Sequence, residues 1–206
     1  MTTTVWTAIV AVSAIGFVTS PIPTPRPVAA PTVLAAVGGP PDTLVVNPRA
    51  SAISWRGTGL GGRAARTGTV SMASGMFVLR HEKLTSGVFT IDMRSLDGAL
   101  RGADLFDVAR YPTAVFSSTG MKRVGQARWE VSGNLTMRGT TKPITFETDV
   151  RWEELGHMIA TSSFTLDRRQ WGIADGSAVT DGVVDNGIEI SITLDARRKQ
   201  AAVATR

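Results

Sequence analysis

The sequence of 206 residues contains no cysteine and only two histidines. Without cysteine, the chain can form neither a disulfide scaffold nor a Cys nucleophile, an iron–sulfur cluster or a zinc site with thiolate ligands. Two histidines are too few for a three-histidine metal site, although one could serve in a catalytic triad. We therefore expect no metal and no cofactor, and the composition leaves the cellular compartment open.

Acidic residues are in the minority, because 17 Asp and Glu stand against 22 Lys and Arg, for a formal net charge of +5. Such an excess favours an anionic partner, such as a nucleic acid, a membrane surface or a phosphorylated ligand. It is small for a dedicated nucleic-acid binder of this length, and most aromatic residues fall at inward strand positions rather than among exposed basic ones. We predict no nucleic-acid partner, and a basic surface protein stays as an alternative.

One long apolar run lies near the N-terminus, where the 14 residues from Val5 to Val18 carry no charge. The run is too short for a comfortable transmembrane helix and is typical of the apolar region of a secretory signal. No Lys or Arg precedes it, and no good cleavage site follows promptly. We predict a signal-like or anchor segment at 1–19 and a periplasmic or other extracytoplasmic location. Cleavage or retention of the segment is left open.

Proline is scarce except in one segment, since seven of the ten prolines lie between Ser20 and Pro41. We predict a stiff, extended spacer over 20–41, because proline-rich stretches favour the polyproline II conformation. Residues 42–196 are expected to form one domain, and 197–206 a basic, frayed tail. Arg26 is the single charged residue before 42, so the remainder carries +4.

Within the domain, apolar and polar residues alternate, as in strands that bury one face. The pattern is clear in six stretches, at 89–93, 114–118, 129–137, 144–152, 160–166 and 187–194. Turn dipeptides such as Asp-Gly and Asn-Gly separate these stretches. A short helix is expected around Leu100 to Ala109, before Pro112. Seven or eight antiparallel strands predict an all-β sandwich or an up-and-down barrel.

Motifs for catalysis and nucleotide binding are weak. Gly57 to Gly62 fits GxGxxG, but the residues after it lead into another strand rather than the helix that a dinucleotide site requires, which favours a glycine-rich hairpin loop. No GxSxG nucleophile elbow occurs. His81 and His157 fall in predicted turns, and we interpret both as solvated loop residues. We therefore predict no catalytic residue, with an enzyme that acts on a hydrophobic substrate through one of these histidines as the alternative.

Four segments carry a more specific pattern. They are SAISW at 51–55 with TGTV at 67–70, LFDVARYPTAVFSS at 105–118, VSGNLTMRGTTKPITF at 131–146 and FTLDRRQWGI at 164–173. In this order they resemble the YceI-like family of bacterial polyisoprenoid-binding proteins, and the resemblance covers nearly all of 42–196. The chain departs from the family pattern at Arg66, where His is usual, at Leu105, where Phe is usual, and in the shorter segment 97–104. These departures bear on which ligand fits and how its polar end is held.

The resemblance implies an extended, eight-stranded, lipocalin-like antiparallel barrel with an internal apolar cavity. An eight-stranded barrel is just wide enough inside to be filled by side chains or to hold one small ligand, which is compatible with the alternating strands. The implied partner is a polyisoprenoid or quinone-like lipid, either a quinone or a prenyl phosphate, that the protein carries or sequesters without catalysis. Transient membrane contact and a homodimer are left open.

We predict that apolar side chains at inward strand positions line this cavity, although the same residues would equally fill a packed core. They are Phe89, Ile91, Phe116, Trp129, Val131, Leu135, Phe146, Phe164 and Trp171. Arg168, with Asp167 beside it, is interpreted as a structural bridge at the barrel end.

Overall fold

The computed structural model describes residues 42–59, 65–81, 83–154, 156–173 and 184–199. The chain divides into two compact units, Met1–Val37 and Gly38–Arg206, and every described residue belongs to the second. The predicted segments at 1–19 and 20–41 lie outside the described residues, as do residues 200–206 of the predicted tail. Arg197 and Arg198, which were assigned to that tail, lie in the last strand.

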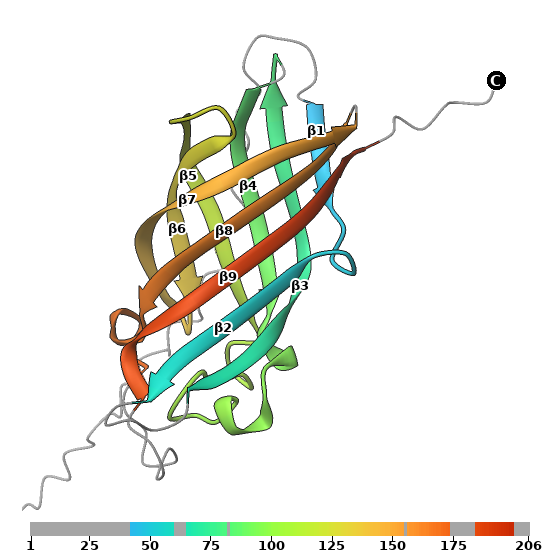
Figure 1. Ribbon diagram of the computed structural model, residues 1–206. Coiled ribbons are helices and arrows are strands. Elements are labelled where there is room, and N and C mark those ends of the chain that lie inside the picture. Colours follow the sequence, from blue (N-terminus) through green and yellow to red (C-terminus); the bar gives the residue numbers. More distant parts are fainter. Residues whose placement is uncertain (1–41, 60–64, 82, 155, 174–183, 200–206) are drawn as a thin grey trace, which may run out of the picture. The chain divides into compact units, whose positions relative to one another are not determined.

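The described residues form nine antiparallel strands that close into a barrel (Figure 1). The strands are β1 (Asp42–Val46), β2 (Ala52–Gly59), β3 (Arg66–Arg80), β4 (Lys83–Asp92), β5 (Thr113–Arg123), β6 (Arg128–Met137), β7 (Thr140–Glu154), β8 (His157–Asp167) and β9 (Val184–Arg198). Their order is β3-β2-β9-β8-β7-β6-β5-β4, and the pairing of β3 with β4 closes the ring. The expected all-β fold and the eight-stranded barrel are confirmed.

Nine strands occupy eight positions because β1 and β2 share one. Near one end of the barrel, β1 lies between the last residues of β3 and β9, pairing Val45 with Met76 and with Arg197. Farther along the same two strands, β2 takes this place. Between the last pair of β1 (Val46 with Ala196) and the first pair of β2 (Ala52 with Thr193), β9 has only two residues, whereas the chain has the five residues 47–51. These five residues therefore loop out, and the shared strand is interrupted there.

The predicted helix around Leu100 to Ala109 is wrong. The helices among the described residues are short 3-10 turns, η2 (Met93–Ser95), η3 (Gly98–Leu100) and η4 (Arg168–Trp171). Residues 101–110 form successive turns instead. Asp107 lies in the left-handed region at φ 45°, and its N–H donates to the carbonyl of Gly102, five residues back. A regular helix cannot continue through such a residue.

β-bulges change the inward face of two strands. In β3 the register with β4 shifts between Met72 and Ser74, so the buried positions move from Met72 to Phe77 and Leu79. In β5 it shifts between Ser118 and Gly120, after which Met121 faces the interior. The extra residue of a bulge re-aims the side chains that follow it.

One end of the barrel is filled by the segment that follows β8. Trp171, on η4, is 1% exposed, and its indole N–H donates to the carbonyl of Leu135 at 3.1 Å. The guanidinium of Arg138, in the β6–β7 turn, donates to the carbonyls of Gly172 and Ala103. These two bonds join the β6–β7 turn to the end of η4 and to the turn segment 101–110.

Candidate functional site: an apolar cavity inside the barrel

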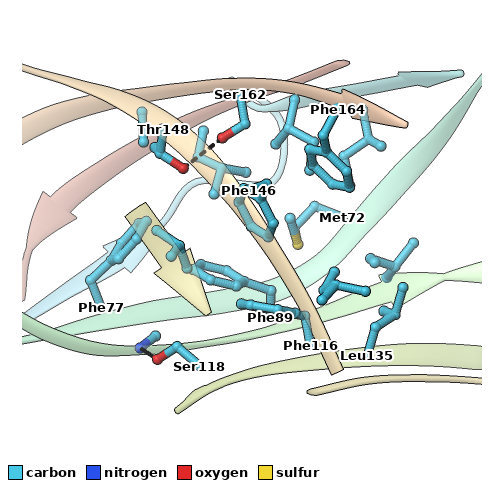
Figure 2. A pocket seen from close by; sticks show the side chains of 18 of the residues that line it. Met72, Phe77, Phe89, Phe116, Ser118, Leu135, Phe146, Thr148, Ser162 and Phe164 are labelled. Carbon is cyan, nitrogen blue, oxygen red and sulfur yellow. Dashed lines mark hydrogen bonds between the residues drawn. The ribbon is translucent and has the colours of Figure 1, made fainter. Parts of the chain in front are cut away.

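The interior of the barrel holds a cavity of about 100 Å³ that is partly open to solvent (Figure 2). Inward side chains from β2 to β9 line it, as the alternation within each strand requires. None of the lining residues that the structure describes is charged. The site therefore offers a ligand mainly apolar surface, and its binding energy would come from removing apolar groups from water.

Five of the seven phenylalanines of the chain lie on this lining, each from a different strand. Neighbouring rings are in contact around the wall, with ring centroids 4.9 Å apart for Phe77 and Phe89, 6.2 Å for Phe89 and Phe116, 5.5 Å for Phe116 and Phe146 and 4.4 Å for Phe146 and Phe164. We call these five residues the phenylalanine belt. Such contacts stabilise the rings against one another and present a continuous aromatic surface.

Three glycines leave space for the rings of the phenylalanine belt. A Cβ at Gly133 would lie 2.4 Å from the ring of Phe116, and one at Gly75 would lie 2.7 Å from the ring of Phe89. Gly87 is also close, since its Cβ would lie 2.9 Å from Phe89. The rings of Phe116 and Phe89 therefore occupy space that a side chain at these three positions would fill, which leaves the centre of the barrel less crowded.

Three hydroxyl groups interrupt the apolar lining. Thr148 and Ser162 lie directly opposite one another on β7 and β8, with 2.8 Å between their oxygens. On another part of the wall, the Ser118 oxygen accepts the backbone N–H of Gly87 at 2.7 Å. Figure 2 shows these hydroxyls on the same side of the view as Phe77, away from Leu135 and Phe164.

Of the nine residues proposed as lining, seven lie at the cavity: Phe89, Ile91, Phe116, Val131, Leu135, Phe146 and Phe164. The structure does not place Trp129 and Trp171 there. Trp129 is half-buried and packs against the core, and Trp171 fills the barrel end described above. Trp129 follows the inward alternation of β6, which core positions and cavity positions share, whereas Trp171 lies on η4, after the end of β8.

Sequence reasoning missed several lining residues. Phe77 and Met121 follow the bulges in β3 and β5, and a bulge has no signature in a single sequence. Thr148 and Ser162 could have been found, because each interrupts an apolar series at an inward position. A hydroxyl in such a series indicates a polar contact inside the barrel.

The two histidines lie away from the cavity lining. His81 is exposed in the β3–β4 turn, as expected for a solvated loop residue. The same expectation for His157 is wrong, because His157 is the first residue of β8 and its side chain is only 14% exposed. Its Nε2 lies 2.8 Å from Oδ2 of Asp195.

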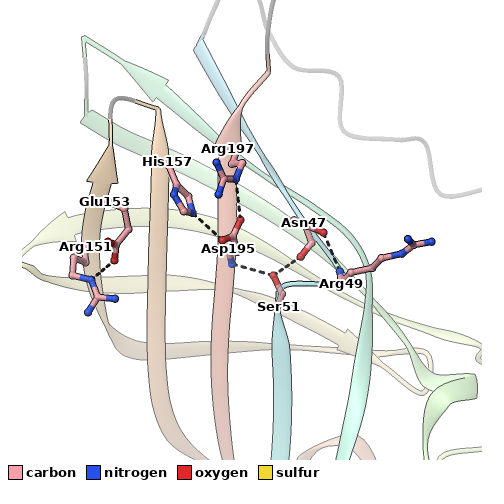
Figure 3. A network of polar contacts seen from close by, with 8 residues as sticks. All are labelled: Asn47, Arg49, Ser51, Arg151, Glu153, His157, Asp195 and Arg197. Carbon is pink, nitrogen blue, oxygen red and sulfur yellow. Dashed lines mark hydrogen bonds and ion pairs between the residues drawn. The ribbon is translucent and has the colours of Figure 1, made fainter.

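The His157–Asp195 pair belongs to a polar network on the outer face (Figure 3). The N–H of Asp195 donates to the Ser51 hydroxyl at 3.0 Å, and that hydroxyl donates to the carbonyl of Asn47 at 2.8 Å. Asn47 in turn donates its N–H to the carbonyl of Asp195 at 2.8 Å. The network satisfies the backbone where the β1–β2 strand is interrupted, which gives these residues a structural role.

Asp167, which stands beside Arg168 in the structural bridge expected at the barrel end, is paired with Arg169. Arg169 donates from Nη2 to Oδ2 of Asp167 at 2.7 Å and from Nε to Oδ1 at 3.0 Å. These bonds hold the pKa of Asp167 below its ordinary value. Asp167 also accepts the N–H of Arg169 as the N-cap of η4, so the bridge fixes the chain as it leaves β8.

No three His, Asp or Glu side chains gather among the described residues in a way that could hold a metal ion. Over the same residues, no helix is long and apolar enough to cross a membrane.

A model of the YceI-like domain matches residues 44–196. The chain belongs to the YceI-like domain family. One relative, a UPF0312 protein of Pseudomonas putida strain GB-1, is 30% identical over 139 residues, which cover 60% of this chain and 71% of that protein. The alignment with another UPF0312 protein, from Azotobacter vinelandii, spans only 25% of that relative.

Two solved structures share the YceI-like barrel. BcnA of Burkholderia cenocepacia matches with a TM-score of 0.62 at 20% identity, over 73% of this chain and 98% of that one. A domain from Saccharophagus degradans, described as polyisoprenoid binding and implicated in plant cell wall breakdown, matches with a TM-score of 0.60 at 14% identity. That match covers 76% of this chain and 98% of the domain. At these identities the likeness establishes the fold.

Proposed function

We propose that this YceI-like barrel binds a polyisoprenoid or a similar long apolar lipid in its cavity and carries or sequesters it without covalent chemistry. The observation that carries the proposal is the cavity itself, whose described lining contains the phenylalanine belt and no charged residue. Each methylene that moves from water into such a site gains about 0.8 kcal/mol, so a long chain binds well with few polar contacts. The polyisoprenoid-binding domain of Saccharophagus degradans, with the same fold, supports this ligand class.

The size of the cavity adds a requirement. A space of about 150 Å³ holds one benzene molecule, so the cavity of about 100 Å³ holds only a short part of a prenyl chain. Uptake of a long chain therefore requires lining side chains to move apart. Met72 and Met121 suit this role, since the unbranched thioether adapts its shape at low cost.

Catalysis has less support. The histidines lie away from the cavity, and none of the described lining residues is a histidine or carboxylate that could activate the hydroxyls inside it. The apolar segment at 5–18 supports an extracytoplasmic location, where a lipid carrier would meet membrane-derived ligands.

The test is the lipid content of the protein. We expect full-length protein from a bacterial host to retain a prenyl lipid, detected by native mass spectrometry and by lipid extraction. The variant Ser162→Leu narrows the cavity and should lower the lipid-bound fraction severalfold. Ser163→Leu is the matched control, since it makes the same change on the exposed face of the same strand. Protein recovered empty, which also takes up no prenyl lipid from vesicles, would contradict the proposal.

A further inference from the structure

The three hydroxyls of the cavity wall are unusual for a site that holds only hydrocarbon. Thr148 is 6% exposed, and it faces the same space as the phenylalanine belt. A polar group that is kept from water costs free energy unless it is hydrogen-bonded, so a wall meant only for hydrocarbon would gain by carrying Val or Ala instead. The hydroxyls therefore call for a functional account.

The hydrogen bonds of these three residues do not use all of their hydroxyl hydrogens as donors. A hydroxyl carries one donor hydrogen and two acceptor lone pairs. In the Thr148–Ser162 pair only one hydroxyl can donate to the other, so one hydrogen remains. Ser118 acts as an acceptor for Gly87, and its own hydrogen is directed to no residue that the structure describes. The cavity wall thus presents two hydroxyl hydrogens that can be donated to a ligand, one at the Thr148–Ser162 pair and one at Ser118.

We propose that Ser118, Thr148 and Ser162 recognise a neutral oxygen on the buried part of the ligand, such as a carbonyl or hydroxyl oxygen. This inference rests on the proposed lipid binding and names the ligand class more closely. The cavity would take oxygen-bearing neutral isoprenoids, quinones or alcohols, in preference to prenyl phosphates. A neutral acceptor uses the spare hydrogens and brings no charge into the apolar space.

A phosphate group in the cavity would lack a counter-charge. Among the described residues, no Lys, Arg or His lines the cavity, and burying an uncompensated anion in apolar surroundings is strongly unfavourable. Two neutral hydroxyls cannot replace the cation that a phosphate requires. Selection between the two ligand classes thus follows from the residues of the wall.

The outer face of the barrel offers a matched reference. Ser132 and Thr145 form the same kind of cross-strand hydroxyl pair, with 2.9 Å between their oxygens, between β6 and β7. That pair is exposed, so water satisfies its remaining donor. The variant Ser132→Ala/Thr145→Val therefore removes an equivalent pair without touching the cavity.

The experiment compares three probes that share one carbon skeleton: geranylgeraniol, geranylgeranyl diphosphate and the corresponding hydrocarbon. Each displaces a neutral naphthylamine fluorophore from the full-length protein. We expect the alcohol to bind about threefold to tenfold more tightly than the hydrocarbon, as one net hydrogen bond allows, and more tightly than the diphosphate. Thr148→Val/Ser162→Ala should remove most of this preference, because the alcohol loses its hydrogen bond and the hydrocarbon does not, whereas the outer-face variant Ser132→Ala/Thr145→Val keeps it.

Adding Ser118→Ala to this double variant should remove the rest of the preference for the alcohol. If the triple variant is unstable, the double variant alone still tests the inference. Equal binding of alcohol and hydrocarbon by the unmodified protein, or tightest binding of the diphosphate, would overturn the inference and leave lipid binding intact. The same holds if the double variant keeps the full preference. Failure of all three probes to displace the fluorophore would instead count against the proposed function.

Discussion

At the scale of single residues, glycine determines how far the aromatic rings reach into the barrel. Gly133 and Phe116 are on neighbouring strands, and the ring occupies the place where a Cβ of residue 133 would project. The carbonyl oxygen of Ser117 lies only 2.6 Å from the same point, so backbone as well as side chain would have to move. The open space at the cavity therefore depends on a missing methyl group.

The variant Gly133→Ala should destabilise the protein by about 1–3 kcal/mol, the usual cost of overpacking. Urea unfolding, followed by fluorescence, measures the loss as a lower midpoint at an unchanged slope. Because Phe116 would be pushed toward the cavity, uptake of apolar probes should also fall.

Gly120→Ala is the control for this change. Gly120 lies on the adjacent strand β5, and no atom of another described residue lies within 4 Å of the position that its Cβ would take. Reduced freedom of the unfolded chain then makes the substitution neutral or slightly stabilising. Equal stability of the two variants would contradict the role given to Gly133.

At the scale of elements, one short motif ends two of the strands. Asp92 ends β4 and caps η2, and Asp167 ends β8 and caps η4. In each case the carboxylate accepts the N–H and the guanidinium of the Arg two residues later, Arg94 or Arg169. The sequence Asp-x-Arg thus turns the chain out of the sheet in both places.

This motif predicts a pH dependence. The hydrogen bond from Arg94 holds the pKa of Asp92 below its ordinary value, as Arg169 does for Asp167. A lowered pKa contributes stability that is fully present above about pH 4 and is lost as the pH falls through the pKa of the folded state. Carboxyl NMR titration should show Arg94→Gln raising the pKa of Asp92 and leaving that of Asp167, and Arg169→Gln doing the reverse. Ordinary pKa values for both groups in the unmodified protein would refute the interpretation.

The strands were easier to predict than their irregularities. The alternation of apolar and polar residues located β6 to β9, because each of these strands buries one continuous face. This prediction needs no information on which strands pair with one another. The bulges in β3 and β5 depend on the neighbouring strands, and so does the division of one strand position between β1 and β2. The helix expected before Pro112 failed because the turn at Asp107 is held by contacts with residues of its own loop.

For the site, the sequence predicted the apolar character of the cavity lining better than it predicted which residues belong to that lining. Inward Phe and Val residues lie at the cavity, whereas Trp171, on η4 after the end of β8, fills the barrel end instead. Burial alone does not tell whether the space in front of a side chain is filled, since that depends on residues from other strands. The empty space inside the barrel is therefore a property of the closed ring and not of any one strand.

At the scale of the whole molecule, charge and cavity are separate. The net charge is +5, and ion pairs such as Arg128 with Glu147 lie on the outer surface. Over the part of the chain that the structure describes, no charged residue lines the cavity. Surface charges are screened by salt, with a Debye length of about 10 Å at 0.1 M and about 3 Å at 1 M. Binding inside the barrel depends on apolar contact and should not be weakened in this way.

We therefore predict that the affinity for a neutral apolar probe stays constant, or rises slightly, between low and high salt, as fluorescence titration can measure. A basic surface protein that binds membranes or nucleic acid gives the opposite result, because neutralising several phosphates makes the affinity fall steeply with salt. Titrating the same preparation with anionic vesicles that carry no prenyl lipid separates the two cases. A steep loss of probe binding with salt would show that the ligand is held at the basic outer surface and not in the cavity.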